Sequence, residues 1–174
     1  MTGANDVVPA GIDERTFWQA IGQRAVGVAV VTAATENGPA GFLALSATHV
    51  SANPPRTLVS IDNRTSALPV IQSARHFAIN YLAHDDVKLA DQFAGRTGVK
   101  GSDRFKEGQW RVLRTGAPIL TRAVGALDCI LEETIEKDRT LLALGRLVDF
   151  TADPSLEPLI HFRGEYRSFS AYPT

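Results

Sequence analysis

Small and hydroxyl-bearing residues interrupt a hydrophobic run between Gly41 and Pro55. Ser46 and Thr48 are separated by Ala47, and two prolines close the segment. Side chains of this size let a flat ligand lie directly against the backbone, where peptide N–H groups can hydrogen-bond its rim. A buried strand followed by a loop explains the same composition, so the segment alone leaves both interpretations open.

A second cluster of polar residues runs from Asp62 to Ser66 and contains Asn63, Arg64 and Thr65. We expect it to follow a strand over 57–62 and to open a helix whose N-cap is Ser66. An arginine, two hydroxyls and the N–H groups of a helix N-terminus together form a cradle for phosphate. The alternative is a solvated turn with an N-cap. Beside a flat apolar shelf, a phosphate site suits a mononucleotide cofactor.

Other residues that can carry chemistry have structural alternatives. Asp138 and Arg139 form either a catalytic pair near the shelf or a charged hairpin turn. Cys129 lies in an apolar stretch and is predicted to be a buried structural thiol. The four histidines lack metal-ligand spacing with it, so no metal site is expected. Three aromatic residues could stack on a ligand or fill the core: Phe93, Phe105 and Trp110.

Hydrophobic periodicity and turn residues predict strands with few short helices. Asp13 is a plausible N-cap for a first helix, and Glu36 to Pro39 is a turn that returns the chain as the second strand. Strands are predicted over 25–32, 41 onward, 57–62, 76–82, 124–135, 140–150 and 165–169. A second helix is predicted from Ser66 and a third over 85–94, and residues 95–117 are predicted to form a long loop over the surface. These elements predict a mainly β protein with a closed or nearly closed barrel.

Length and charge limit the possible functions. The 174 residues suggest one domain over 13–174 after a flexible segment, 1–12. The net charge of −1 gives no electrostatic reason to bind nucleic acid or an anionic membrane. No secretory signal or membrane span is recognisable, which favours a reducing cytoplasm.

Several short motifs occur in an order that resembles the flavin reductase family, which has the FMN-binding split-barrel fold. This family includes the small reductase components of two-component flavin monooxygenases. The similarity covers roughly residues 14–169. The motifs that carry it are Gly27-Val28, the segment Gly41 to Pro55, the strand Phe77 to Leu82, the helix Leu89 to Ala94, Asp103-Arg104-Phe105, Gly116 to Leu120, Pro158-Leu159, and Gly164-Glu165-Tyr166.

The resemblance implies a Greek-key-like antiparallel split barrel with a few peripheral helices. It further implies a homodimer with flavin in a groove near the subunit interface, and hydride transfer from NADH or NADPH to FMN or FAD. The reduced flavin would serve a partner monooxygenase. By the same carry-over, Val26 and Gly27 approach the ring and Asn63, Arg64 and Ser66 hold the phosphate, while the isoalloxazine edge is lined by Ala44, Leu45, Ser46, Ala47 and Thr48.

Two departures from the family pattern leave alternatives open. Leu43, Leu45 and His49 make the flavin segment more apolar than usual, and Arg139 stands where members have a histidine that helps to seat the nicotinamide. Arg139 is therefore the catalytic candidate, as a partner for an NAD(P)H phosphate or for negative charge on reduced flavin. The alternatives are a flavin- or tetrapyrrole-binding protein without NAD(P)H oxidation, and a flavin-dependent reductase of another acceptor such as a corrin.

Overall fold

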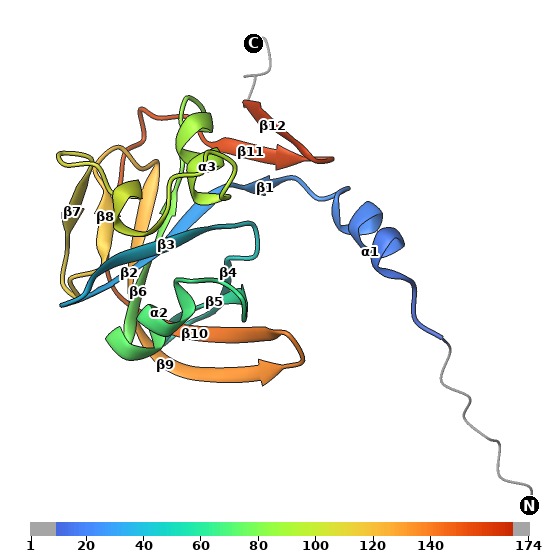
Figure 1. Ribbon diagram of the computed structural model, residues 1–174, viewed down its shortest axis with the longest axis horizontal. Helices are drawn as coiled ribbons and strands as arrows, with labels where there is room; N and C mark the ends of the chain where they lie inside the picture. Colours follow the sequence, from blue (N-terminus) through green and yellow to red (C-terminus); the bar gives the residue numbers. More distant parts are fainter. Residues whose placement is uncertain (1–9, 169–174) are drawn as a thin grey trace, which may run out of the picture.

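A seven-stranded antiparallel sheet forms the body of the protein in the computed structural model, which describes residues 10–168 (Figure 1). The predicted flexible segment, 1–12, lies largely outside these residues. The sheet has the order β3-β2-β6-β9-β10-β5-β4. Its strands are β2 (Ala29–Thr35), β3 (Gly38–Ala44), β4 (Thr48–Ala52), β5 (Pro55–Asp62), β6 (His76–Tyr81), β9 (Gly125–Lys137) and β10 (Thr140–Ala152).

The strand predicted over 25–32 is two strands, because the chain changes sheets at Val28. β1 (Val26–Gly27) pairs with β11 (Leu159–Phe162), whereas β2 pairs with β3 and β6. Val28 donates its N–H to the carbonyl of Leu159, and its own carbonyl accepts the N–H of Leu82. β11 continues into β12 (Glu165–Ser168) and completes a second, three-stranded sheet. β11 was not predicted.

The valine-rich stretch does cover both sides of the sheet, as predicted for a strand that is buried on two faces. Because strand side chains alternate, Ala29 and Val31 enter one hydrophobic cluster while Val28 and Val30 enter the other. Phe77, Ile79 and Ile61 fill the first cluster, together with their neighbours.

Part of the surface loop predicted over 95–117 is wrong, since its aromatic residues reach the second cluster. A 3-10 helix, η1 (Gly101–Arg104), precedes β7 (Trp110–Val112), which pairs with β8 (Pro118–Leu120). The ring centroids of Phe105 and Trp110 are 4.9 Å apart, and each lies within 5.7 Å of Phe93. These three rings pack on one another, which supports the core interpretation over ligand stacking.

A buried polar network fixes β8 against the barrel. The side-chain amide of Asn80 donates to the carbonyl of Val30 at 3.1 Å, and its oxygen accepts the N–H of Leu120 at 2.8 Å. The hydroxyl of Thr32 donates to the carbonyl of Pro118. Each hydrogen bond satisfies a buried polar group that would destabilise the fold if it had no partner.

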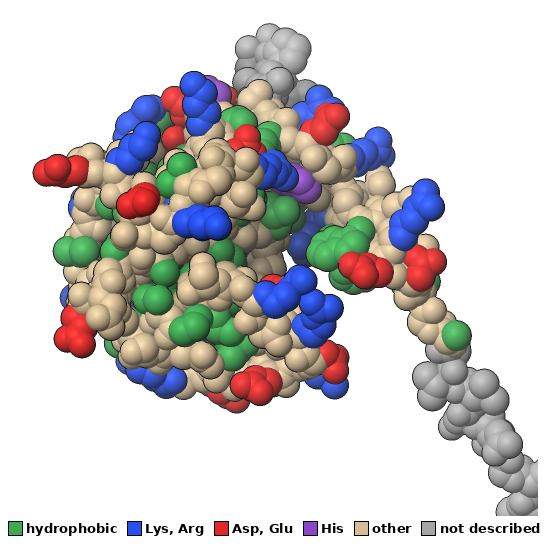
Figure 2. Space-filling view, in the orientation of Figure 1, with side chains coloured by type: hydrophobic (Ala, Val, Ile, Leu, Met, Phe, Trp, Pro, Cys, Tyr) green, Lys and Arg blue, Asp and Glu red, His purple; other side chains and the backbone are tan. Residues whose placement is uncertain are grey.

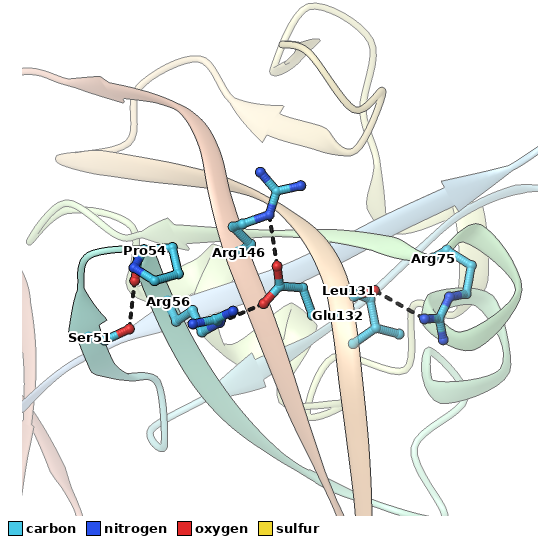
Figure 3. A network of polar contacts seen from close by, with 7 residues as sticks. All are labelled: Ser51, Pro54, Arg56, Arg75, Leu131, Glu132 and Arg146. Atoms are coloured by element: carbon cyan, nitrogen blue, oxygen red, sulfur yellow. Dashed lines mark hydrogen bonds and ion pairs between the residues drawn. The ribbon is translucent and has the colours of Figure 1, made fainter.

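The β9–β10 hairpin carries a second polar network where its register shifts (Figure 3). Glu133 pairs with Leu144 and Leu131 with Gly145, which leaves Glu132 as the bulged residue. Its carboxylate accepts from Arg56 on β5 at 2.6 Å and from Arg146 on β10 at 2.8 Å. Three adjacent strands are thereby joined by one acid.

Three short α-helices lie outside the sheets within residues 10–168. Asp13 caps α1 (Glu14–Ile21) as predicted, accepting the N–H of Thr16 at 2.7 Å. α2 (Leu68–Ala74) begins one residue later than expected, with Ala67 rather than Ser66 as its N-cap, so the prediction for Ser66 is wrong. The shift arises because a turn intervenes, in which Leu68 donates to the carbonyl of Thr65.

The last helix, α3 (Val87–Phe93), is shorter than the predicted 85–94. It follows Asp86, whose carboxylate accepts the N–H of Ala83 rather than a helical N–H. Within residues 10–168, no helix has both the length and the apolar character needed to cross a membrane.

Candidate functional site

The central part of the site is the loop 45–47, which links the two edge strands of the seven-stranded sheet. β3 ends at Ala44 and β4 begins at Thr48, although these strands lie at opposite ends of the strand order (Figure 1). The Ser46 hydroxyl donates to the carbonyl of Ser60 at 3.1 Å and accepts the N–H of Ser60 at 3.2 Å. One side chain therefore holds the loop against β5.

The backbone of this loop is left with unused donors. Among residues 10–168, the N–H groups of Leu45, Ser46 and Ala47 donate to no protein acceptor. All three residues are half-buried. Half-buried N–H groups without a protein partner are donors available to a ligand rim, and their use by a flat ligand stays a prediction.

The side chains of the same segment point in different directions. Ala44 is buried in the first hydrophobic cluster, and Ala47 packs against that cluster. Leu45 packs against the second cluster. Thr48 is exposed, and its carbonyl accepts the hydroxyl of Thr57 at 2.8 Å. Ala44 can therefore offer a ligand its backbone but not its side chain.

The polar segment 62–66 starts at Asp62, the last residue of β5, two residues beyond the Ser60 that holds Ser46. Arg64 folds back onto Asp62, with its Nη2 at 2.7 Å and its Nε at 3.0 Å from the carboxylate oxygens. These bonds lower the pKa of Asp62 far below its ordinary value and raise that of Arg64. The Arg64 guanidinium is thus already paired in this structure.

Other donors of that loop remain open to an anion. The N–H of Asn63 is taken by the carbonyl of Arg139 at 3.0 Å, which places Arg139 beside the loop. Asn63 and Ser66 are exposed. Among the described residues, the N–H and hydroxyl of Ser66 have no protein partner. The phosphate donors on hand are therefore the Ser66 groups and the Asn63 amide, with Arg64 available once it leaves Asp62.

A cavity of about 170 Å³ lies between this loop, the start of α2 and the tip of the β9–β10 hairpin. Asn63 lines it together with the acidic Glu136 and Asp138. Two carboxylates disfavour an anion there, so phosphate is better placed toward Ser66. Arg139 follows the left-handed Asp138 (φ 53°) and is exposed at the tip of the β9–β10 hairpin.

Val26 and Gly27 lie three and two residues before Ala29, which pairs with Ala44 at the end of the β2–β3 ladder. β1 therefore leaves the sheet close to the point where the 45–47 loop begins, and it pairs with β11 instead. A Cβ built on Gly27 would meet no atom within 4 Å, which shows that the space above it is open. The bonds between Ser46 and Ser60 therefore bring the 45–47 loop close to the polar segment at the end of β5, while the roles assigned to these residues stay predictions.

Sequence reasoning missed two aromatic residues beside this edge. His161 on β11 pairs with Val26, and its ring centroid is 6.1 Å from that of Tyr166 on β12. Arg96 lies over the Tyr166 ring, 5.7 Å from its centroid, and forms an ion pair with Asp91. The only available signal was the final Gly-x-Tyr motif, because β11 itself was not predicted.

The loop 45–47 joins the two edge strands of the main sheet, and the architecture is that of a mainly β split barrel. Residues 21–170 match the flavin reductase like domain, and the chain belongs to that family. It is 33% identical over 151 residues to "FMN reductase (NADH) RutF" of Agrobacterium fabrum, with 87% of this chain and 86% of the relative covered. The reductase subunit HsaB of a flavin-dependent monooxygenase from Rhodococcus jostii is 28% identical, with 95% and 83% covered.

Solved structures agree with the fold. The NADH:FAD oxidoreductase SgcE6 of Streptomyces globisporus superposes with a TM-score of 0.83 at 27% identity, covering 94% of this chain and 99% of that one. The flavin reductase PheA2 gives a TM-score of 0.82 at 28% identity, covering 91% and 99%. The predicted split-barrel fold and family are confirmed.

Proposed function

We propose that this protein is an NAD(P)H:flavin oxidoreductase that passes a hydride to FMN or FAD. The observation that carries the proposal is the loop 45–47, where three half-buried N–H groups have no protein acceptor among residues 10–168. An isoalloxazine rim offers the matching acceptors. The family match and the names of the NADH-dependent relatives support the same activity.

When bound, the flavin supplies the hydride-acceptor chemistry. The protein then has to position the flavin and the nicotinamide and to shield them from water. N–H groups of Leu45, Ser46 and Ala47 orient the ring edge, and the small Gly27 leaves the facing side open for nicotinamide to approach within about 3–3.5 Å. Asn63, Arg64 and Ser66 hold the phosphate. Arg139, which meets Asn63 through its carbonyl, is the nearby cation for charge that develops on reduction.

The proposed function also covers the oligomeric state of the protein and the enzyme that consumes the reduced flavin. We assign a homodimer with the flavin near the subunit interface, in a cytoplasm that supplies NAD(P)H. The reduced flavin passes to a monooxygenase. The name of the HsaB relative, the reductase subunit of a flavin-dependent monooxygenase, supports this assignment.

An anaerobic titration tests the activity. The purified protein is mixed with FMN or FAD, then with NADH or NADPH, and the visible flavin absorbance is followed. Catalytic bleaching supports a reductase, and the four combinations identify both substrates. If flavin binds and neither nicotinamide bleaches it, the reductase proposal is wrong.

A second candidate is a flavin-binding barrel without NAD(P)H oxidation, and the observation that favours it is Arg139 in place of the family histidine. Arg139→His separates the two. If the protein is a carrier that lost activity through this change, the variant gains NADH-dependent bleaching at unchanged FMN affinity. If wild-type protein already turns over and the variant does not exceed it, the carrier interpretation is wrong.

A further inference from the structure

A groove outside the proposed flavin loop lies between α1 and the turn that joins β11 to β12. It is an open groove of about 550 Å³. Arg15, Trp18 and Gln19 of α1 form one wall, and Arg163 and Gly164 of the turn form the other. This volume is typical of small-molecule sites. Figure 2 shows the surface hollowed where α1 leaves the barrel, with basic side chains near the hollow.

The groove is built by specific contacts between its two walls. The N–H of Arg163 donates to the carbonyl of Gly22 at 3.1 Å, and its Nε donates to the Gln23 side chain at 3.0 Å. A Cβ on Gly22 would lie 3.1 Å from the Trp18 carbonyl and 3.9 Å from the Cα of Arg163. The helix end is therefore fixed against the turn, and glycine permits the close approach.

The arginine in the turn occupies a position that its backbone disfavours. Phe162 pairs with Glu165, so Arg163 and Gly164 form a two-residue hairpin loop, and both have positive φ angles (51° and 84°). Asn-Gly is the natural pair for such a turn, because left-handed backbone is unfavourable for a long side chain. The Arg163 side chain offsets part of this cost inside the protein, because it hydrogen-bonds Gln23 and lies over the Phe162 ring, and both contacts aim its guanidinium along the groove wall.

The groove offers charge and an aromatic surface without neutralising partners. Among the described residues, neither Arg15 nor Arg163 forms an ion pair. Trp18 is 61% exposed although it lies against the groove. The Arg163 guanidinium contacts only neutral groups, the Gln23 side chain at 3.0 Å and the Phe162 ring at 4.9 Å from its centroid, so its charge is not neutralised. Two such guanidiniums suit a diphosphate, and an exposed indole suits a stacked purine.

We propose that this groove binds the adenosine diphosphate half of a dinucleotide. The inference rests on the proposed function, since NAD(P)H and FAD both carry this group. The geometry connects the two sites: Gly22 lies four residues before Val26, a distance of at most about 14 Å of extended chain. A dinucleotide whose reactive ring lies above Gly27 can therefore place its diphosphate between Arg15 and Arg163.

Direct binding of ADP tests the groove without any reduction step. Trp18 fluorescence is followed while ADP is added up to several millimolar, and we expect saturable quenching. Trp18→Phe should abolish the signal, because the other tryptophan, Trp110, is half-buried among aromatic rings. Absence of quenching in the wild-type protein, as when a second copy of the chain fills the groove, overturns the proposal.

Two arginine variants separate ligand binding from folding. Arg163→Asn removes the guanidinium and its hydrogen bond to Gln23 but supplies a residue that the turn prefers, so the two effects offset and stability should change little while ADP binds about tenfold more weakly. Arg15→Gln should weaken ADP similarly. Arg167→Gln is the control, because its exposed ion pair with Glu165 lies outside the groove. Equal ADP affinity in all three variants overturns the proposal.

Steady-state kinetics identify which dinucleotide uses the groove. With FMN as acceptor only the nicotinamide substrate carries ADP, so a tenfold higher KM for NADH in Arg163→Asn assigns the groove to NADH. A lost preference for FAD over FMN, with KM for NADH unchanged, assigns it to FAD. If neither value moves, the groove has no part in binding either substrate. If ADP quenches the Trp18 fluorescence of the wild-type protein but the protein never oxidises NADH, the reductase proposal is wrong and the proposal for the groove is unaffected.

Discussion

Ser46→Ala should loosen the junction between the two edges of the barrel. The substitution removes two hydrogen bonds, one to the carbonyl and one from the N–H of Ser60. Each contributes about 1 kcal/mol net, so the free energy of unfolding should fall by about 1–2 kcal/mol. For a domain of this size that corresponds to a melting temperature lower by about 2–8 °C.

The same variant should bind FMN more weakly, because the loop that donates to the ring is no longer held in place. If ordering the loop again costs about 1.4 kcal/mol, the affinity falls about tenfold. Urea titration measures the stability, and flavin fluorescence quenching measures the binding. Ser46→Thr retains the hydroxyl and should recover most of both.

A matched serine supplies the control. Ser51 donates one hydrogen bond to the carbonyl of Pro54 at the exposed end of β4, so Ser51→Ala should change stability by less than about 0.5 kcal/mol. If Ser46→Ala is no more destabilising than Ser51→Ala, the hydroxyl does not hold the loop. Equal FMN affinity at a lowered stability would show that the loop is not part of the flavin site.

Two further predictions concern the framework. Gly145→Ala places a Cβ 2.4 Å from Cζ of Phe77, so urea titration should show a free energy of unfolding lower by about 1–3 kcal/mol. Adding Phe77→Leu should recover part of this loss. If Gly145→Ala leaves the stability unchanged, this description of the packing is wrong. Hydrogen bonding to Arg56, and then to Arg146, lowers the pKa of Glu132 from 4.5. Its contribution to stability is therefore present above pH 4.5 and lost as the pH falls through the lower folded value. Glu132→Gln should flatten the acid limb of a stability–pH curve, and an unchanged limb would refute this role.

Sequence patterns were reliable where one local rule decides the structure. Asp13 caps α1, and the valine-rich stretch is buried on both faces, because capping and alternation act over a few residues. The strand pattern was enough for the barrel, and the shared order of several short motifs, with the segment from Gly41 to Pro55 among them, was enough for the family. The failures came from tertiary context. No local pattern shows that the chain changes sheets at Val28. The change is visible only in its partners, because its N–H bonds to Leu159 of β11 and its carbonyl to Leu82 just after β6.

The site residues show the same division. The small side chains identified the 45–47 loop, but the bond between Ser46 and Ser60 joins residues 14 apart and depends on closure of the barrel. Arg64 looked like a phosphate ligand from its neighbours, and only the coordinates pair it with Asp62. The groove beside α1 was missed entirely, because its walls come from opposite ends of the chain.

The position of the 45–47 loop links ligand binding to the edges of the sheet. β3 and β4 are the first and last strands of the seven-stranded order, yet only three residues separate them in the chain. A flavin that immobilises those residues restrains both margins at once, so fraying of either margin has to include release of the ligand. Amide hydrogen exchange should therefore slow together in β3 and β4 when FMN is added, although these strands do not pair with each other.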